Sequence, residues 1–595
     1  MADGADIDGF LGVAASLSGR RWRTRPADPD LVRAHQARSG LSEPLARALA
    51  ARQVSAEAGG TYLAPTLKAL FPDPSSFAGM DDAARILIDA LVRQEPMTIF
   101  ADYDVDGASS AALLVRWFRA MGVELPIYIP DRLTEGFGPT PAAFRKIQEA
   151  GAKLVVTLDC GAAAHDAIAE AAAIGLNLIV IDHHLMDHLP AGVAALVNPN
   201  RPDCGSGQGN LPAAGVAFVL LAALNREARG RGLFSDRPEP DLLAWLDLAA
   251  LGAVCDVTQL TGFNRALAAQ GLKVMSGWAN PGLAALRRVA GLERDTAGVF
   301  EAGFVLGPRI NAGGRIGRCD LGARLLSTDD PALAADLAQQ LDALNAERKA
   351  VERAILEEAI AVIEAASNFD QGAPILVVAR EGWHPGVVGI VASRLRERYR
   401  RPAIVLGIDP ASDIAKGSGR SQPGVNLGRA ISEAYREGLL LSGGGHAMAA
   451  GMTLRPSAVP ELRAFLADRL STDVAAAVAA EALDIDALIS PGPGARQMLE
   501  LFRPLAPFGP GAPEPMFALA DVRVQGAQPV RGGHIRCRLV DAGGAHVEAI
   551  AWRAGDSALG ARLLAGGGAL HAAGKLKENP WRGPDAVQFE IEDLA

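Results

Sequence analysis

The first half of the chain alternates short apolar runs with stretches of helical spacing. Three runs, at 97–103, 153–159 and 177–182, are largely apolar and have the length of buried strands. Helical patterns rich in Ala follow the first two runs. Apolar strands that alternate with helices are typical of a parallel sheet with helices on both faces. The pattern therefore predicts an α/β domain.

A long helix and a second α/β unit are predicted next. Residues 331–366 carry apolar side chains at three- and four-residue spacing, with charged residues between them and almost nothing that breaks a helix. Two apolar runs, at 374–379 and 403–408, then flank a helical pattern at about 387–399. The segment LSGGGHAMAAGMTL (441–454) is predicted as a Gly-rich turn followed by a strand.

The last part of the chain has the pattern of a small β-barrel. A Pro/Gly segment, PLAPFGPGAPEP (504–515), precedes five strand-like runs, and a helical run at 557–566 separates the third from the fourth. Three strands, a helix and two strands is the order of an OB-fold, which often binds single-stranded nucleic acid.

The chain of 595 residues is long enough for several domains, each with its own core. The predicted class is α/β: a parallel-sheet domain joined by a long helix to a smaller α/β domain, followed by an OB-fold β-barrel. The predicted divisions are an N-terminal segment at 1–80, the first α/β domain at 81–325, the connecting helix at 326–370, the second α/β domain at 371–470, a linker segment at 471–513 and the OB-fold at 514–595.

Composition and charge narrow the class of protein. An apolar fraction of 49% with few aromatic residues fits a soluble α/β protein. No apolar run is long enough to cross a bilayer, and no secretory signal is visible. Five cysteines without paired spacing favour a reducing cytoplasm and no zinc site. A net charge of −10 argues against a protein that coats nucleic acid, although it is compatible with a local basic channel.

Three aspartates stand at alternate positions where the first predicted strand ends, in DYDVDG: Asp102, Asp104 and Asp106. Alternate residues of an extended segment point the same way, and clustered carboxylates repel each other. A hard cation between them would remove that cost. Taken alone, the stretch is equally well explained as a strand-to-helix turn with an Asp cap.

Further polar residues follow the other predicted strands. Asp159 ends the second strand, and the triplet at 182–184, Asp-His-His, ends the third. Asp256 follows an apolar helical segment. The carboxyl ends of parallel strands share one edge of a sheet, where α/β proteins place their sites. Carboxylates with one or two imidazoles suit Mn²⁺ or Mg²⁺, and two such ions about 4 Å apart could activate water and stabilise the leaving oxygen of a phosphoester.

Together, these motifs resemble a known superfamily. DYDVDG, LDCG, the DHH triplet and GAVCDV are similar to the four motifs of the DHH phosphoesterases, and GGGHAMAAG (443–451) is similar to the hallmark of the associated DHHA1 domain. The OB-like unit and GPRINAGGR (307–315) narrow the resemblance to the 5′-to-3′ exonucleases of this superfamily that are specific for single-stranded DNA. The resemblance covers roughly residues 80–595.

The resemblance implies catalytic and metal-binding roles. His184 matches the position that contacts the scissile phosphate or supports the metal site, and Asp102 is a further catalytic candidate or weak ligand. Asp182 is expected to orient a histidine. The positions that match the ligands of two Mn²⁺ or Mg²⁺ ions are Asp104, Asp106, Asp159, His183 and Asp256, with Asp159, also a catalytic candidate, as the bridge.

One position departs from the pattern of the superfamily. Some of its members have a histidine four residues before the first ligand aspartate, and Phe100 stands there in this chain. We therefore expect the first metal site to have fewer ligands and to bind its ion more weakly.

Polar and basic loops are expected to hold the DNA backbone. A single arginine is more often part of an intramolecular ion pair, but neighbouring Gly, Asn and Ser favour phosphate binding. Ser418 and Arg420 resemble the family's pocket for a 5′-phosphate, and His446 resembles its substrate-contact histidine. The substrate-binding candidates are Arg132, Arg309, Asn311, Arg315, Ser418, Arg420 and His446.

The OB-like unit mixes basic residues with aromatic rings on which bases could stack. For Trp552, a place in the barrel core is equally compatible with the sequence. The candidates for nucleic-acid binding in this unit are Arg536, Trp552, Lys575 and Trp581.

The predicted function is metal-dependent exonuclease activity on single-stranded DNA, 5′ to 3′, releasing mononucleotides in recombination and repair. The expected partners are a single strand with a 5′ end, a helicase and a single-strand-binding protein, with a cytoplasmic monomer and no membrane. One alternative is a phosphodiesterase for short oligonucleotides or cyclic dinucleotides, which would not need the long architecture. The other is a non-catalytic scaffold that binds single strands, against which the intact ligand set argues.

Overall fold

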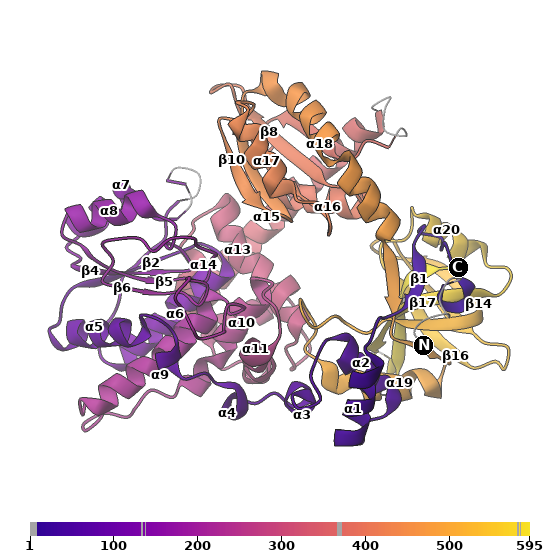
Figure 1. The fold of residues 1–595 in the computed structure, drawn as a ribbon, viewed down its shortest axis with the longest axis horizontal. Helices are drawn as coiled ribbons and strands as arrows, with labels where there is room; N and C mark the ends of the chain where they lie inside the picture. Colours follow the sequence, from indigo (N-terminus) through magenta and orange to yellow (C-terminus); the bar gives the residue numbers. More distant parts are fainter. Residues whose placement is uncertain (1–8, 132–134, 137, 366–371, 580–581, 584) are drawn as a thin grey trace.

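The structure is a computed structural model that describes residues 9–131, 135, 136, 138–365, 372–579, 582, 583 and 585–595. Figure 1 shows the second α/β domain, in orange, between the first α/β domain and the yellow barrel, with the N-terminal segment beside the barrel. Two residues predicted to bind substrate, Arg132 and Trp581, lie outside the described residues. No helix in the described part of the chain combines the length and apolarity needed to cross a membrane.

The first domain is built on a parallel sheet of five strands. Its order is β3 (Ile127–Tyr128), β2 (Met97–Ala101), β4 (Leu154–Leu158), β5 (Asn177–Ile181) and β6 (Ala195–Val197). The three strands predicted from their apolar runs are the central ones. The two edge strands are only two and three residues long, too short to produce a recognisable pattern.

Alternate residues of these strands face two separate apolar layers. Ile99 and Val156 pack with the helices on one face, whereas Phe100 and Val155 pack with those on the other. The first face is covered by α5 (Met80–Val92), α6 (Val105–Ala120) and α9 (Ala213–Gly230), and the second by α7 (Pro141–Glu149) and α8 (His165–Ala173).

Further helices complete the first domain and lead out of it. Arg309, Asn311 and Arg315 were expected to lie in a polar loop, and this expectation was wrong, because α13 (Gly307–Ile316) is a helix. Gly314 faces the ring of Tyr103 so closely that any side chain would collide with it, so this glycine serves helix packing. The remaining elements are α10 (Leu246–Cys255), α11 (Gly262–Met275), α12 (Pro281–Val289), the π-helix η4 (Glu301–Leu306), α14 (Leu321–Ser327) and the long helix α15 (Pro331–Ala365).

The second domain has a mixed sheet in the order β10-β11-β9-β8-β7. The segment KGSGRS (416–421), which carries Ser418 and Arg420 and was expected to be one of the polar loops, lies mainly in a strand, and so does GGGH, which was predicted as a turn. Several of their glycines occupy crowded positions, such as Gly419 against Leu427. The strands are β7 (Leu376–Glu381), β8 (Ala403–Asp409), β9 (Ile414–Arg420), β10 (Ser442–His446) and β11 (Ala449–Leu454), with helices α16 (Val388–Tyr399), α17 (Leu427–Arg436) and α18 (Val459–Ala480).

The C-terminal domain has the predicted order of three strands, a helix and two strands. Strand β14 pairs with β15 on one side and with β17 on the other, which closes the five strands into a barrel. A short strand, β13 (Ala487–Ile489), adds to β14. The barrel consists of β14 (Phe517–Val530), β15 (His534–Val540), β16 (His546–Ala551), α20 (Ala558–Ala565), β17 (Leu570–Glu578) and β18 (Val587–Leu594).

The N-terminal segment is tied to the barrel. Strand β1 (Arg21–Thr24) pairs in parallel with β12 (Ala482–Ile485), and the buried indole of Trp22 donates a hydrogen bond of 3.1 Å to Asp593. Helix α2 (Glu43–Ala51) contributes leucines to the barrel's core. This segment carries arginines at 20, 21, 23 and 25, and three of them form ion pairs, such as Arg23 with Asp484 at 2.6 Å.

A buried arginine connects the first domain to the N-terminal segment and to the linker before the barrel. Arg265 of α11 donates hydrogen bonds of 2.8–2.9 Å to the backbone carbonyls of Tyr62, Leu505, Ala506 and Pro507. Its guanidinium also lies over the Tyr62 ring, 3.9 Å from the centroid. Because its removal would leave several buried carbonyls without a donor, this residue fixes the linker against the first domain.

Candidate metal centre and substrate surface

Three neighbouring strands deliver acidic side chains to one edge of the first sheet. The backbone N–H of Asp102, after β2, donates to Leu158 at 3.2 Å, and that of Asp159, after β4, donates to Ile181 at 3.0 Å. Asp182 follows β5 and is bonded in the same way to Val197 at 3.0 Å. The sheet's hydrogen bonds therefore continue into these residues and hold them side by side, as the sequence predicted.

Two helix N-termini hold the carboxylates that follow the first strand. Asp104 caps α6 and accepts from the N–H groups of Asp106 and Gly107 at 2.8 and 3.1 Å. Buried Asp106 accepts from those of Ala213 and Ala214 at 2.6 and 2.9 Å, at the start of α9. These N-termini favour negative charge. Burial, with the nearby charges of Asp256 and Asp104, nevertheless raises the pKa of Asp106 well above its usual range.

Asp159 lies at the centre of the cluster. Its φ of 61° is in the left-handed region, which a non-glycine residue adopts at a cost and which points to a functional constraint. Burial first, and then the charges of Asp106 and Asp104, raise the pKa of its carboxyl well above the usual value.

His183 points into the carboxylates. Its Nε2 lies 3.2 Å from Oδ1 of Asp159, 3.6 Å from Oδ2 of Asp256 and 3.8 Å from Oδ2 of Asp106. Burial lowers the pKa of this imidazole to about 4, so it is neutral at physiological pH. A neutral imidazole offers a lone pair, which is the form that binds a metal ion.

Asp256 reaches the cluster from a different element, directly after the last residue of α10. Burial and the charge of Asp104 raise its pKa to about 7. The C-terminus of a helix carries partial negative charge, which further disfavours a carboxylate there. A metal cation in the cluster would offset these costs.

Asp182 does not join the cluster but holds the second histidine. Its Oδ1 accepts from His184 Nδ1 at 2.8 Å, and its Oδ2 accepts from the N–H of Ala162 at 2.9 Å. Although burial opposes the charged form, the hydrogen bond and charge of His184 lower the pKa of Asp182 to about 2. The same bond raises the pKa of His184 to about 9. His184 is therefore a cation held at the solvent-facing side of the site, and the expectation that Asp182 orients a histidine is confirmed.

The donor atoms fit divalent cations. Three sets of ligand atoms each lie within 4.8 Å of one another: Asp106, His183 and Asp256; Asp102, Asp104 and Asp159; and Asp159, His183 and His184. Nε2 of His183 is buried and, among the described residues, makes no hydrogen bond. The first two sets, which are rich in carboxylates and have at most one imidazole, suit Mn²⁺ or Mg²⁺, whereas His184 in the third is held as a cation by Asp182. Because the sets share Asp159 and His183, they are suited to two ions with a common ligand.

Phe100, at the position where some members of the superfamily have a histidine, belongs to the core. It is fully buried, and its ring lies 5.6 Å from that of Tyr128 and 5.8 Å from that of Phe144. The side chain therefore packs with the helices of the second face and supplies no ligand.

The second domain gathers three of the predicted substrate residues on one face of its sheet. Arg420 on β9 pairs with Ala449 on β11, and Ala449 pairs with His446 on β10. Arg420 and His446 therefore lie in one row across the sheet. Ser418 is two residues from Arg420 and therefore faces the same way. His446 is exposed.

A glycine that the sequence analysis did not single out makes room for this group. A Cβ on Gly389, at the start of α16, would lie 3.1 Å from Nη2 of Arg420 and 3.3 Å from Oγ of Ser418. The sequence carries only a weak signal for this role, because glycine is also found at helix starts as a simple N-cap.

Helix α13 of the first domain contacts the second α/β domain. Nη1 of Arg315 donates to the carbonyl of Gly386 at 3.1 Å. Arg309 is largely buried and bonded to Asp342 and to the Val305 carbonyl, both at 2.8 Å, so it takes part in an intramolecular ion pair. The amide oxygen of Asn311 is buried and makes no hydrogen bond to any described residue.

In the barrel, Trp552 is on the surface. Its side chain is 51% exposed, meets the ring of His534 edge to face at 4.8 Å, and donates to Glu590 at 2.9 Å. The alternative that this tryptophan fills the barrel core is therefore wrong. Arg536 lies on the adjacent strand β15, and Lys575 is 3.4 Å from Glu514.

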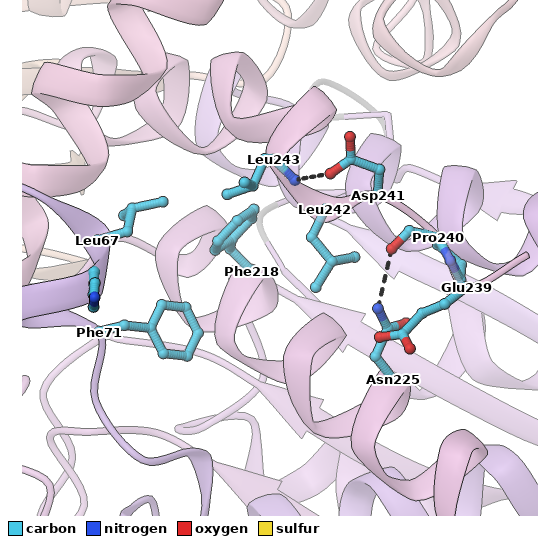
Figure 2. Close-up of a pocket in the computed structure, with 10 residues that line it drawn as sticks. Leu67, Phe71, Phe218, Asn225, Glu239, Pro240, Asp241, Leu242 and Leu243 are labelled. Atoms are coloured by element: carbon cyan, nitrogen blue, oxygen red, sulfur yellow. Dashed lines mark hydrogen bonds between the residues drawn. The ribbon is translucent and has the colours of Figure 1, made fainter.

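A cavity of about 530 Å³ lies in a different part of the first domain. Figure 2 shows Phe71, Phe218 and Leu242 around it, and the amide of Asn225 donating to the Pro240 carbonyl at 3.1 Å. Among the described residues, none that was predicted for catalysis or binding lines this cavity. The candidate chemistry thus lies at the sheet edge.

Comparison with known proteins agrees with this arrangement. Family models match at residues 96–253 (DHH family, N-terminal domain), 372–472 (DHHA1 domain) and 485–593 (RecJ OB domain). The fold and the acidic site thus define a DHH-family protein with a DHHA1 domain. Within that class, the chain belongs to the RecJ family.

Individual relatives match over most of the chain. The single-stranded-DNA-specific exonuclease RecJ of Bacillus subtilis is 34% identical, over 97% of this chain and 71% of the relative, and that of Escherichia coli is 34% identical over 87% and 90%. The crystal structure of Thermus thermophilus RecJ in complex with Mn²⁺ matches with a TM-score of 0.77 and 32% identity, over 97% of this chain and 79% of the other. The structure of the same protein with Mg²⁺ matches with a TM-score of 0.70.

Proposed function

We propose that this protein is a metal-dependent exonuclease that degrades single-stranded DNA from its 5′ end to mononucleotides, in DNA recombination and repair. Relatives at about 34% identity over most of the chain are exonucleases specific for single-stranded DNA. The observation that carries the proposal for this chain is the cluster of buried carboxylates around His183 at one sheet edge.

The proposed reaction is hydrolysis of a phosphodiester. A water oxygen bonds to the phosphorus between the first and second nucleotides, the bond from phosphorus to O3′ of the first breaks, and that O3′ receives a proton. The products are a 5′-mononucleotide and a strand one nucleotide shorter, which again carries a 5′-phosphate. Each cycle thus regenerates the kind of end that the next cycle requires.

We assign the metal ligands to the carboxylates of Asp104, Asp106 and Asp256, the imidazole of His183, and Asp159 as the shared ligand. Crystal structures of RecJ proteins in complex with Mn²⁺ and with Mg²⁺ support these two metals. When bound, two such ions supply an activated water and positive charge for the leaving oxygen. Asp102 lies within the same set of acidic groups and completes it.

His184 and the second domain are assigned to the substrate. With its pKa raised to about 9 by Asp182, His184 is a cation beside the site and is suited to the negative charge of the scissile phosphate. Ser418, Arg420 and His446 are assigned to the 5′-terminal phosphate. Polarity requires such a contact, because a metal centre alone does not distinguish the two ends of a strand.

We propose that the remaining residues predicted to bind substrate contact the DNA strand beyond its 5′ end. Arg132, Arg309, Asn311 and Arg315 are assigned to the backbone near the site, with Arg309 exchanging its bond to Asp342 for a phosphate. Arg536, Trp552, Lys575 and Trp581 are assigned to more distant nucleotides, and the half-exposed ring of Trp552 supports this.

The setting that we propose is the reducing cytoplasm, where a helicase and a single-strand-binding protein supply and protect the strand and the enzyme acts as a monomer without a membrane. Support for the compartment comes from the cysteines, all five of which are free.

One assay tests the function against its alternatives. Labelled single strands, duplexes and dinucleotides are incubated with Mn²⁺, Mg²⁺ or EDTA. Stepwise release of mononucleotides from the 5′ end of single strands, abolished by EDTA, is expected. Cleavage confined to dinucleotides would favour the phosphodiesterase for short oligonucleotides, and binding without cleavage would favour the non-catalytic scaffold.

A further inference from the structure

Two phenylalanines stand exposed on the surface of the first domain. Phe300 directly precedes the π-helix η4 and is 64% exposed, and Phe304 lies within it and is 70% exposed. Their rings are stacked, with centroids 5.7 Å apart and planes 21° from parallel. Large aromatic side chains are usually buried, so an exposed and ordered pair on a soluble protein calls for a ligand.

The pair is joined to the metal centre through α10. A Cβ on Gly303 would lie 3.3 Å from Val254, and one on Gly307 would lie 2.7 Å from the sulfur of Cys255. The thiol of Cys255 also donates to the carbonyl of Ala302 at 3.5 Å. The π-helix therefore packs on the last turn of α10, and the next residue in the chain, Asp256, is part of the carboxylate cluster.

The local geometry keeps both rings on the outside. Ala302 is buried against α10, whereas Phe300 and Phe304 are four positions apart and share the opposite face. A π-helical turn is rare and frequently marks a functional site. Val257, which follows Asp256 of the carboxylate cluster, is also exposed and has a left-handed φ of 58°.

We propose that Phe300 and Phe304 form a stacking platform for unpaired bases of the DNA strand whose 5′ end occupies the metal centre. The platform rests on the proposed function and adds to it a specific contact for the strand. Aromatic faces bind bases of any sequence, because every base offers a π-face. A base laid on the outer ring continues the stack that the two rings begin, whereas a base inside a duplex already has both faces covered by its neighbours.

The surroundings favour a nucleic acid strand as the occupant. The guanidinium of Arg309 is bonded to the carbonyl of Val305, the residue after Phe304, and is paired with Asp342, so a cation that a phosphate could engage is tied to the π-helix. The π-helix that carries the rings packs on the end of α10, and the next residue in the chain, Asp256, belongs to the carboxylate cluster. We expect a long strand that is held at the metal centre to reach the platform, and a dinucleotide to be too short to reach it.

The test compares strands of different length in variants of the full-length protein. Phe300→Ala/Phe304→Ala, Phe304→Leu and Phe304→Trp are measured beside Tyr435→Ala, which removes an exposed aromatic ring from α17 in the second domain. Binding of 5′-phosphorylated oligothymidylates of 2 to 16 nucleotides is measured in EDTA, and single-turnover cleavage is measured with Mn²⁺.

We expect the double variant to bind the 16-nucleotide strand about 5- to 150-fold more weakly, the range for loss of stacking on one base. Its cleavage of the dinucleotide should stay within about twofold of wild type. Phe304→Trp should retain binding and Phe304→Leu should lose it, because leucine keeps the apolar surface without the aromatic face. Tyr435→Ala should behave as wild type.

Strands with one abasic position locate the contact. In the wild type, one abasic position should weaken binding, and in the double variant the same position should have no further effect. The platform is refuted by wild-type binding of long strands in the double variant, by normal binding in Phe304→Leu, or by equal losses on the dinucleotide and the long strand. If the wild type binds strands as described in EDTA but cleaves none with either metal, the proposed function fails while the platform stands.

Discussion

The imidazole Nε2 of His183 lies 3.2 Å from the carboxylate Oδ1 of Asp159. These two side chains follow neighbouring strands, β5 and β4, and carboxylates from two further elements approach the same nitrogen. The arrangement is costly without a cation, since the carboxylates repel each other and lose their solvation. Removing a charge from the cluster and adding a cation to it should therefore both stabilise the folded protein.

Asp159→Asn should abolish cleavage while it increases the thermal stability of the metal-free protein. The amide of asparagine cannot serve as a charged ligand for two ions. The substitution also removes a buried carboxyl group, whose pKa burial raises because the charged form is disfavoured there. Asparagine also tolerates the left-handed backbone at this position. We expect a rate loss of at least about 100-fold with Mn²⁺, in line with the loss of a group that stabilises the transition state. Turnover at the wild-type rate would refute the shared-ligand assignment.

The stabilisation by Mn²⁺ should be larger at pH 8 than at pH 5.5. Burial raises the folded-state pKa of Asp106 and Asp159, and raises that of Asp256 to about 7. In EDTA the folded state therefore holds more protons than the unfolded state between about pH 4 and pH 7, and stability falls as the pH rises through this window. Bound Mn²⁺ replaces those protons and removes the loss.

Thermal unfolding in Mn²⁺ and in EDTA at both pH values measures this difference. Asp247→Asn is the matched control, because burial raises the pKa of Asp247 to about 6 and it lies outside the sets of ligand atoms. In this variant the Tm in EDTA should depend less on pH than in the wild type, and the increase in Tm caused by Mn²⁺ should be unchanged. An equal shift of Tm at both pH values would contradict the prediction.

Asp182→Asn should narrow the active pH range on the alkaline side. The charged hydrogen bond of Asp182 raises the pKa of His184 to about 9, so the wild-type imidazole stays protonated up to that pH. Without that charge the pKa falls towards the usual value of about 6.5, and the rate should decline at a lower pH. Single-turnover rates from pH 6 to pH 10 test this. A loss that is the same at every pH would indicate that Asp182 acts only in folding or positioning.

Arg420→Ala should reduce cleavage of 5′-phosphorylated strands much more than that of 5′-hydroxyl strands. A terminal phosphate carries more charge than an internal diester, and a hydrogen bond to a charged group contributes about 1.5–3 kcal/mol. Arg455→Ala is the control, since Arg455 is paired with Asp413 on the surface of the same domain at 3.2 Å. Equal losses on the two substrates would place the end-sensing contact elsewhere.

Trp552→Ala/Arg536→Ala should weaken the binding of long strands by about 1–3 kcal/mol, the range for one stacked base, and leave dinucleotide cleavage unchanged. These point substitutions are a cleaner test than deletion of the whole barrel, residues 510–595. The deletion would also remove Asp593, which accepts a hydrogen bond from Trp22, and the core into which α2 packs. Tight binding of long strands by the double variant would show that this face of the barrel does not hold DNA.

The parts of the molecule that were predictable follow from strong local patterns. The central strands are continuous apolar runs, and the aspartates and histidines that end them share one edge in any parallel sheet. Edge strand β3 has two residues, and no periodicity exists at that length. Strands β9 and β10 are rich in glycine, so they resembled loops, and only contacts such as Gly419 with Leu427 show why glycine is required there.

Long-range pairing was beyond local patterns. No feature of RWRT indicates that it pairs with residues near position 484, and the partner of Arg309, Asp342, lies in a different helix. The stacking of Phe300 on Phe304 was equally hidden, because two phenylalanines four positions apart are more often part of a core.

The pairing of β1 with β12 has a consequence for the way in which the chain is made. Arg23 and Asp484 are 461 positions apart, so a ribosome adding about 5–20 residues per second needs roughly 25–90 s to supply the partner strand after the first has emerged. Throughout that interval Trp22 and an unpaired strand are open to other nascent chains. Positive charge on an unpaired strand discourages such contacts. We therefore expect the four arginines at 20, 21, 23 and 25 to protect the nascent chain first, and three of them, Arg20, Arg23 and Arg25, form ion pairs in the finished protein.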